Sequence, residues 1–307
     1  MIHNDFELIT ILGPTASGKT SLAVALAKEI GGEIISADSR QIYRGMDIGT
    51  GKDLAEYDEV PFHLIDILDA GEIYGVGQFQ KDFHHVFEQI KARKRVPILC
   101  GGTGLYIQSV LQNFEFTSVP RNAELREAIE SKTIEELRLD FKDMPEHASF
   151  DADTSTHKRL VRAIEIAKWL ESNSLEHCDV QPPKSLTFGI HPNWEVRRAN
   201  ITARLHERFE QGLIEEVEQL LKTGVSEEML IFYGLEYKFI TQYLQGHFDR
   251  ETCFKRLEIA IHQFAKRQMT YFRKMEKDGL AIQWLTEASL ASRLARIKSF
   301  FPIKFVP

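Results

Sequence analysis

The segment GPTASGKT, residues 13–20, carries the residue types best suited to chemistry. It fits the pattern GxxxxGK[ST], in which glycines let the backbone curl so that its N–H groups point inward. Lys19 would then reach the outer phosphates of a ligand, and Thr20 would ligate Mg²⁺. An ordinary glycine-rich turn between a strand and a helix is the alternative. The complete match, placed between such elements, favours a phosphate-binding loop.

Two more polar groups follow candidate strands. Asp38 opens the stretch DSRQIYRGMDIGTGK, and Thr103 lies in CGGTGLY. Strand ends in an open α/β sheet face the ligand crevice, so Asp38 should lie near the bound phosphates. There it could accept a proton from a nucleophile or serve a metal through water, although a helix N-cap is an equal reading. Thr103 offers a hydroxyl and an N–H that could bind a ligand. A glycine-rich turn capped by threonine, with no ligand, is the more common explanation of such a pattern.

The elements that must position these residues alternate in the first part of the chain. Predicted helices begin after predicted strands, which indicates a parallel sheet flanked by helices, with the phosphate loop of a P-loop NTPase-like core. The predicted strands span 6–12, 33–36, 62–68 and 96–100, and the predicted helices span 19–30, 78–93 and 104–111.

The β signal disappears between residues 119 and 183, which predicts a helical insertion domain. The core is therefore expected to comprise residues 1–118 and 184–307. A strand at 185–192 should return the chain to the sheet. Apolar residues then recur every fourth position from Ile201 to Leu221, predicting a long helix interrupted near Gly212. Helices at about 250–275 and 287–300, with the short strand IQWL between them, complete the expected elements.

Composition narrows the class of protein. The 307 residues include 43% hydrophobic and 27% charged residues, as in globular proteins, and neither a membrane span nor a secretory signal is evident. The cysteines, Cys100, Cys178 and Cys253, lie too far apart to suggest a disulfide framework or a CxxC metal site. We therefore expect a cytoplasmic protein with no membrane contact.

The net charge of −7 argues against a general nucleic-acid binder but leaves room for a local basic patch. One candidate lies between Ile259 and Met275, a stretch without acidic residues that contains Lys266, Arg267, Arg273 and Lys274. Contact with nucleic-acid phosphates would follow naturally from it. A solvated helix face is the ordinary reading of such charges.

A phosphate loop usually indicates nucleotide hydrolysis or a kinase, and both require further parts. A Walker B strand should supply an aspartate, for which only Asp66 in HLIDI offers itself, and a kinase needs arginines in a lid. The insertion could provide Arg159 and Arg162 for such a lid. Both activities therefore stay open at this point.

Four segments in this order, GPTASGKT, ADSRQIYRGMDIGTGK, CGGTGLY and AKRQMTYFR, resemble the tRNA dimethylallyltransferases, also called tRNA isopentenyltransferases. The resemblance covers nearly the whole chain. It implies transfer of a dimethylallyl group from dimethylallyl diphosphate to N6 of the adenine at tRNA position 37, with Mg²⁺ as cofactor. By the family's pattern Asp38 is the base and Thr103 assists it, while Arg204 reaches the diphosphate. The loop residues that would bind diphosphate are Gly13, Thr15, Ala16, Ser17, Gly18, Lys19 and Thr20. For Arg204 the alternative to diphosphate binding is a solvent-exposed position on the side of its helix.

The resemblance also implies which residues contact the anticodon stem-loop of tRNA. Ser39, Arg40 and Gln41 would meet the target base, which must be flipped out of its loop to react. The insertion would contribute Lys158, Arg159 and Arg162, and the C-terminal helix Lys266, Arg267, Gln268 and Arg273. We expect a monomer.

Departures from the family's pattern gather in the tRNA-facing half. Ser155 and Thr156 replace an Asn-Asp pair, and Asn200, His262 and Tyr271 stand where other residues are common. Prenyl transfer is therefore better supported than a particular set of tRNAs. A related alternative is an adenylate prenyltransferase acting on free AMP, which would need neither the insertion nor the basic helix.

Overall fold

The computed structural model describes residues 6–145, 150, 152–175 and 181–300, and it divides the chain into two compact units. One unit comprises Met1–Gln112 with Pro182–Pro307, and the other comprises Asn113–Gln181. The sequence had placed these boundaries near 119 and 183. Cys178 lies outside the described residues. Among the described helices, none is long and apolar enough to cross a membrane.

A parallel sheet forms the centre of the larger unit, as the sequence predicted. Its order is β4-β2-β6-β1-β7-β8, and every neighbouring pair runs parallel. These strands are β1 (Leu8–Leu12), β2 (Gly32–Ala37), β4 (Phe62–His63), β6 (Val96–Gly101), β7 (Ser185–Ile190) and β8 (Ile282–Leu285). A second, two-stranded sheet pairs β3 (Tyr43–Arg44) with β5 (Leu68–Asp69).

The expected single strand at 62–68 is wrong. The segment forms β4 and β5, which belong to different sheets. Between them, Leu64 and Asp66 have φ angles of 61° and 55°, outside the range of extended backbone. Apolar periodicity alone did not reveal this break in the backbone.

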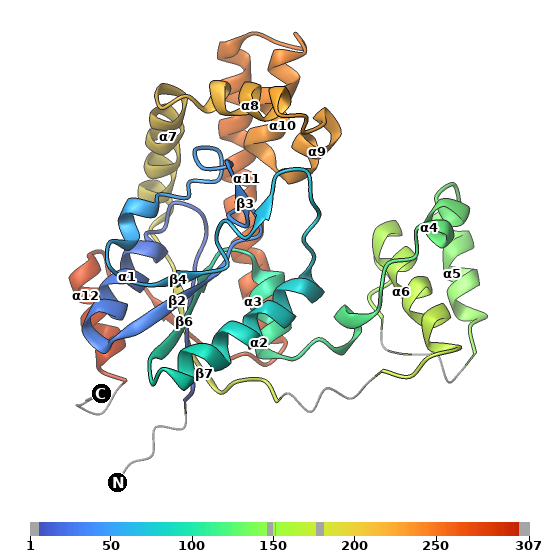
Figure 1. Cartoon of the computed structure of the whole chain (residues 1–307), viewed down its shortest axis with the longest axis horizontal. Coiled ribbons are helices and arrows are strands. Elements are labelled where there is room, and N and C mark those ends of the chain that lie inside the picture. Colours follow the sequence, from blue (N-terminus) through green and yellow to red (C-terminus); the bar gives the residue numbers. More distant parts are fainter. Residues whose placement is uncertain (1–5, 146–149, 151, 176–180, 301–307) are drawn as a thin grey trace. The chain divides into compact units, whose positions relative to one another are not determined.

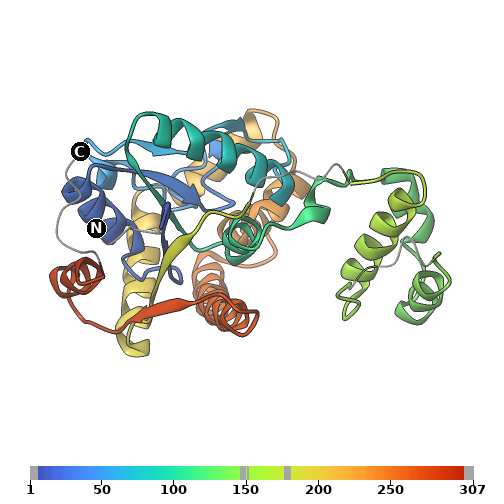
Figure 2. The same cartoon turned by 90° about the horizontal axis from the view of Figure 1, so that it is seen from below.

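Helices cover both faces of the central sheet (Figures 1 and 2). Ile9 and Ile11 of β1 face α1 (Lys19–Ile30) and α12 (Leu290–Lys298), while Leu8 and Leu12 share the opposite core with α2 (Val76–Ala92) and α3 (Gly104–Leu111). This alternation follows from the two-residue period of a strand. Both faces are thereby buried, as a parallel sheet requires.

Five helices lie between β7 and β8 in the described part of the larger unit, and the interruption predicted at Gly212 is confirmed. Gly212 has φ 99° and separates α7 from α8, which suits a residue without a Cβ. Two short helices, α9 and α10, were not predicted. The five are α7 (Trp194–Glu210), α8 (Leu213–Lys222), α9 (Glu227–Tyr233), α10 (Leu235–Leu244) and α11 (Arg250–Lys277).

The smaller unit is helical and has its own core. It contains α4 (Ala123–Ile129), α5 (Ile134–Lys142) and α6 (His157–Leu170), whose buried side chains include Leu137, Leu160 and Ile164. The side chains of Asn122, Thr133 and Thr156 accept hydrogen bonds at the N-termini of α4, α5 and α6. These caps explain why helices begin there.

Candidate phosphate and acceptor site

Three neighbouring strands of the sheet bring the predicted site residues together. β1 ends at the phosphate loop, β2 ends at Asp38, and β6 ends before Thr103. The strands are in register at these ends, where Gly101 of β6 pairs with Leu12 of β1 and Ala37 of β2. A Cβ on Gly101 would lie 2.2 Å from the carbonyl oxygen of Ala37, so this close approach requires glycine. The sheet thus places Asp38 and Thr103 beside the loop.

The phosphate loop is held from outside by three helices of the C-terminal half. The side-chain oxygen of Gln268, on α11, accepts a hydrogen bond from the Thr15 N–H at 2.9 Å. Arg293, on α12, donates to the Ser17 carbonyl at 3.2 Å, and Asn200, on α7, donates to the Ala16 carbonyl at 3.5 Å. The loop's curled backbone, with Ala16 at φ 58° and Gly18 at φ 76°, is therefore stabilised by residues far away in the sequence.

A polar pocket opens around the loop. Lys19 is partly buried at the start of α1, and its burial lowers its pKa, while the charge of Asp38 opposes that shift. Burial and the neighbouring charge of Asp53 raise the pKa of Glu56, which also lines the pocket. The polar and charged side chains around the loop are Thr15, Ser17, Lys19, Thr20, Ser21, Asp38, Asp53, Glu56, Arg204 and Arg208.

Asp38 and Thr103 are joined through the backbone of Ser39. The Asp38 carboxylate accepts a hydrogen bond from the Arg40 N–H at 3.0 Å, within a turn rather than at the start of a helix. The Thr103 hydroxyl oxygen accepts from the Ser39 N–H at 3.0 Å and makes no capping bond to its own helix. Both conventional alternatives, a helix cap at Asp38 and a side-chain cap at Thr103, are therefore absent. Both side chains line the pocket.

Two arginines of α7, Arg204 and Arg208, line the same pocket. Arg204 pairs with Asp53 at 2.8 Å in a contact that is open to solvent. Arg208 and Arg40 both pair with the buried Glu236, at 3.2 and 3.0 Å. The guanidinium of Arg40 also lies 4.7 Å from the centre of the Phe264 ring. Arg40 is therefore engaged in contacts within the protein. Arg208 is buried, and this burial lowers its pKa.

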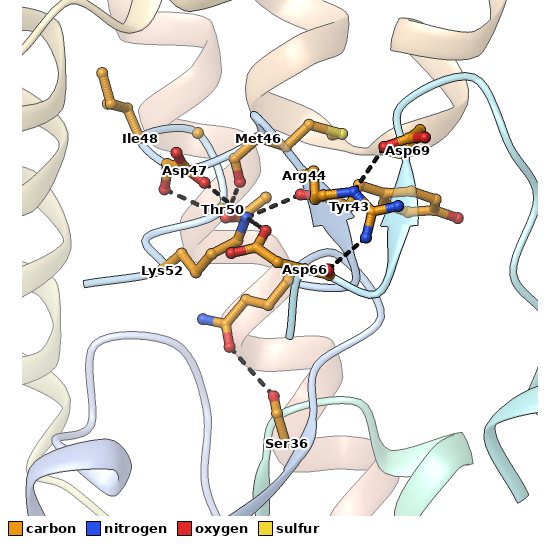
Figure 3. A network of polar contacts seen from close by, with 12 residues as sticks. Ser36, Tyr43, Arg44, Met46, Asp47, Ile48, Thr50, Lys52, Asp66 and Asp69 are labelled. Carbon is orange, nitrogen blue, oxygen red and sulfur yellow. Dashed lines mark hydrogen bonds and ion pairs between the residues drawn. The ribbon is translucent and has the colours of Figure 1, made fainter. Parts of the chain in front are cut away.

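The segment between Tyr43 and Asp69 is organised by Lys52, whose importance the sequence did not reveal (Figure 3). The side chain of Lys52 is 1% exposed, and its ammonium donates to the Tyr43 carbonyl at 2.8 Å and to Asp47 at 2.6 Å. It also pairs with Asp66. Asp66 is thus occupied by Lys52 and does not line the pocket around the phosphate loop. The candidate Walker B aspartate is therefore a structural carboxylate.

Glu216 of α8 fixes the neighbouring turn. Its carboxylate accepts hydrogen bonds from the N–H groups of Asp47, Ile48 and Gly49 at 2.8, 2.7 and 2.9 Å. The hydroxyl of Tyr237 donates to the same carboxylate at 2.8 Å. No local signal could identify this residue, because the backbone N–H groups that it binds lie more than 160 residues away along the chain.

The residues predicted to contact tRNA fall into two groups in the larger unit. Lys266, Arg267 and Arg273 are exposed on α11, and within the described part of the chain none of them forms an ion pair. Gln268 is different, because it is buried, with only 8% of its surface exposed. Gln41 is also engaged internally, since its amide bonds Ser36 and the Gly51 carbonyl at 3.2 and 3.3 Å.

One further arginine extends the basic surface of α11. Burial lowers the pKa of Arg197 on α7, and the nearby charge of Arg273 lowers it further. Lys274, in contrast, is paired with Asp278. The basic surface therefore includes a residue of α7 that the sequence motifs did not single out.

The basic residues that were predicted to contact tRNA from the smaller unit also differ in whether they are exposed or bonded within the protein. Lys158 is exposed, and Arg159 pairs with Asp153 at 2.7 Å on the surface. Arg162 donates to the carbonyls of Phe116 and Val119 at 2.9 and 2.7 Å and pairs with the buried Glu165. The donors of Arg162 are thus directed into its own unit, which argues against the predicted contact with tRNA.

The donor set of the pocket fits a hard divalent cation. Thr20, Asp38 and Glu56 offer hydroxyl and carboxylate oxygens around the loop, the ligand type that Mg²⁺ prefers. Among the described residues there is no group of three or more His, Cys, Asp or Glu side chains placed to hold a metal by themselves. Such a cation would therefore share its coordination with the phosphates of a ligand, as Mg²⁺ commonly does.

Comparisons with known proteins agree with this geometry. The family described as IPP transferase matches residues 41–275, and the family described as isopentenyl transferase matches residues 6–66. A protein of Parabacteroides distasonis named tRNA dimethylallyltransferase 1 is 50% identical over 94% of this chain and 97% of its own length. One of the same name from Porphyromonas gingivalis is 52% identical, covering 91% and 93%. A tRNA isopentenylpyrophosphate transferase structure from Bacillus halodurans has a TM-score of 0.71 at 33% identity, covering 96% and 95%.

Proposed function

Because the chain belongs to the IPP transferase family of tRNA dimethylallyltransferases, we propose that its pocket moves a dimethylallyl group from dimethylallyl diphosphate to tRNA. The acceptor is N6 of the adenine at position 37, and diphosphate is the leaving group. One observation carries this assignment. Asp38 and Thr103 share a pocket with a complete phosphate loop, while the Walker B candidate Asp66 is bonded elsewhere.

The donor side of the pocket binds the diphosphate. Backbone N–H groups of residues 16–18, the Lys19 ammonium and the N-terminus of α1 all favour an anion at this point. As the allylic C–O bond breaks, negative charge grows on the leaving oxygen, and Lys19 stabilises it. Arg204 can exchange its exposed partner Asp53 for a diphosphate oxygen. The loop thereby binds the transition state more tightly than the intact donor.

The acceptor side supplies a base. The exocyclic amine of adenine is a weak nucleophile because its lone pair is delocalised into the ring. As the new C–N bond forms, one amine proton passes to the Asp38 carboxylate, and the electrons of the C–O bond leave with diphosphate. Thr103 holds the turn that carries Asp38, because its hydroxyl accepts from the Ser39 N–H at 3.0 Å and donates to the Ser39 hydroxyl at 3.3 Å. It thereby keeps the Asp38 carboxylate in place beside the reacting amine.

Mg²⁺ is the divalent cation proposed for this pocket. The Thr20 hydroxyl would be its protein ligand, together with oxygens of the diphosphate. When bound, the cation would neutralise charge on the leaving group.

We propose that tRNA binds to the exposed basic side chains of both units. Lys266, Arg267 and Arg273 of α11, with Arg197 of α7, form a surface suited to the phosphates of an anticodon stem-loop. Lys158 and Arg159 of the smaller unit are proposed to add further phosphate contacts. Ser39 remains a candidate to contact the flipped base. Arg40 and Gln41 shape its pocket through the bonds that they make within the protein.

An acceptor comparison tests this function. The protein is incubated with Mg²⁺ and dimethylallyl diphosphate, and diphosphate release is measured with unmodified tRNA or with AMP. We expect release with tRNA, in equal amount to prenylated adenine. Release with AMP alone would instead identify an adenylate prenyltransferase. Hydrolysis of ATP in the absence of either acceptor would indicate a nucleotide hydrolase.

A further inference from the structure

Gln268 occupies a position that its predicted role does not explain. It is buried, and both ends of its side-chain amide are bonded to backbone of the catalytic pocket. Its oxygen accepts from the Thr15 N–H of the phosphate loop, and its nitrogen donates to the Gly102 carbonyl, each at 2.9 Å. Gly102 directly precedes Thr103. One side chain therefore bridges the donor half and the acceptor half of the pocket.

The fit around this bridge is close. A Cβ on Gly102 would lie 2.6 Å from the Gln268 nitrogen, so the amide fills the space that only glycine leaves open. One turn further along α11, the ring of Tyr271 packs against Gly104, where a Cβ would lie 2.3 Å from the ring. α11 thus contacts the Thr103 turn at two successive points and cannot shift without moving it.

The same helix carries the exposed cations on its other face. Lys266 and Arg267 immediately precede Gln268, and both are exposed where Gln268 is buried. A helix transmits a small displacement along its axis because its backbone is rigid. A phosphate contact at Lys266 or Arg267 therefore lies within two residues of the side chain that is hydrogen-bonded to the phosphate loop.

We propose that Gln268 is a positioning residue that couples docking of tRNA on α11 to binding of the donor diphosphate. RNA bound at Lys266 and Arg267 holds α11 in the position where Gln268 orients the Thr15 N–H and the Gly102 carbonyl. The loop is then preorganised for diphosphate. By linkage, bound donor raises the affinity for RNA by the same factor. This inference rests on the proposed function.

Binding measurements test the coupling directly. The dissociation constant of an unreactive donor analogue, with sulfur in place of the bridging oxygen, is measured with and without an anticodon stem-loop that has adenine at position 37. We expect RNA to tighten analogue binding at least about fivefold in the unaltered protein, and less than about twofold in Gln268→Met. Gln263→Met, an exposed glutamine on the same helix, serves as the matched control and should keep the full coupling.

The outcomes separate this inference from the proposed function. A folded Gln268→Met protein with unchanged coupling, or an unaltered protein that transfers the prenyl group to RNA without any coupling, would overturn the inference alone. An unaltered protein that transfers no prenyl group to tRNA would overturn the function. If Gln268→Met does not fold, Gln268→Glu carries the same test, because it keeps the acceptor for Thr15 N–H and loses the donor to Gly102. Its coupling should be reduced, and a full coupling would contradict the inference.

Discussion

The hydroxyl oxygen of Thr103 accepts a hydrogen bond from the backbone N–H of Ser39 at 3.0 Å, across two neighbouring strand ends. The bond is reinforced by the Thr103 N–H, which donates to the Ala37 carbonyl at 3.1 Å. Asp38 lies between these two anchored residues. Its carboxylate is therefore held by the backbone on both sides, which suits a base that must stay aligned with an incoming amine.

Thr103→Val should lower the rate of prenyl transfer by about 100-fold, because misplacement of a catalytic group by about 1 Å has a cost of this order. Valine keeps the branched shape and removes the acceptor for the Ser39 N–H. Single-turnover transfer to an anticodon stem-loop measures the effect. Thr103→Ser, which keeps the hydroxyl, is the control and should stay within about tenfold of the unaltered protein. Equal rates for valine and serine would show that the hydroxyl has no part in the reaction.

The affinity for dimethylallyl diphosphate should fall as pH rises. The fall should begin at a lower pH than it would if the bound ammonium belonged to an exposed lysine. Burial lowers the pKa of Lys19, so its ammonium is present below that lowered pKa and is lost above it. Donor dissociation constants between about pH 7 and 10 report this loss. In Lys19→Arg the charge persists across the range, so the alkaline decline should disappear even if binding is weaker. A decline that is the same in both proteins would assign it to another group.

Lys266→Ala combined with Arg267→Ala should weaken tRNA binding and reduce its dependence on salt. Each lost phosphate contact lowers the slope of log affinity against log salt by about 1, so the pair should lower it by about 2. Lys255→Ala with Arg256→Ala is the matched control, since it removes the same two residue types, also exposed, from the same helix. A slope that changes equally in both double variants would place the docking surface elsewhere.

Glu165→Gln should destabilise the smaller unit by about 1–3 kcal/mol at neutral pH, because Glu165 is buried and accepts from two arginines. Burial alone would raise its pKa, but the hydrogen bonds from Arg126 and Arg162 lower it to about 2. A depressed carboxyl pKa stabilises the fold above the unfolded value of 4.5, and that stabilisation is lost as pH falls toward 2.

The difference between the unaltered protein and Glu165→Gln should therefore shrink as pH falls from about 5 toward 2. Denaturant unfolding can follow this unit alone, because Trp169 lies in α6 and Trp194→Phe with Trp284→Phe removes the two other tryptophans. A constant difference over that range would mean that the charge of Glu165 does not stabilise the unit.

The core of this site could be predicted because its signals are local. The phosphate loop needs glycines at fixed spacing, and the rule that strand ends share one edge of a parallel sheet placed Asp38 and Thr103 beside it. The start of α1 at Lys19 and the break at Gly212 were also visible, since both depend on residues close in the sequence.

What could not be predicted depends on partners distant in the sequence. Gln268 looks like one more polar residue in a basic helix, and only the fold places it against Thr15, 253 residues away. Arg162 reads as a surface cation until the Phe116 and Val119 carbonyls are found beside it. The break at Leu64 and Asp66 arises from positive φ angles, which a leucine rarely adopts and an aspartate adopts more often but does not by itself predict. In each case tertiary contacts decide what the local pattern leaves open.

The role of Asp38 as the base is the central claim, and one paired measurement on Asp38→Asn tests it most directly. Donor binding and single-turnover transfer to an anticodon stem-loop are measured on the same protein. Because the carboxylate acts on the acceptor, the dissociation constant for dimethylallyl diphosphate should stay within about threefold, while the transfer rate falls by about 10²- to 10⁴-fold. Transfer at a near-normal rate in this variant would contradict the account, since a side chain without a basic oxygen cannot take the amine proton.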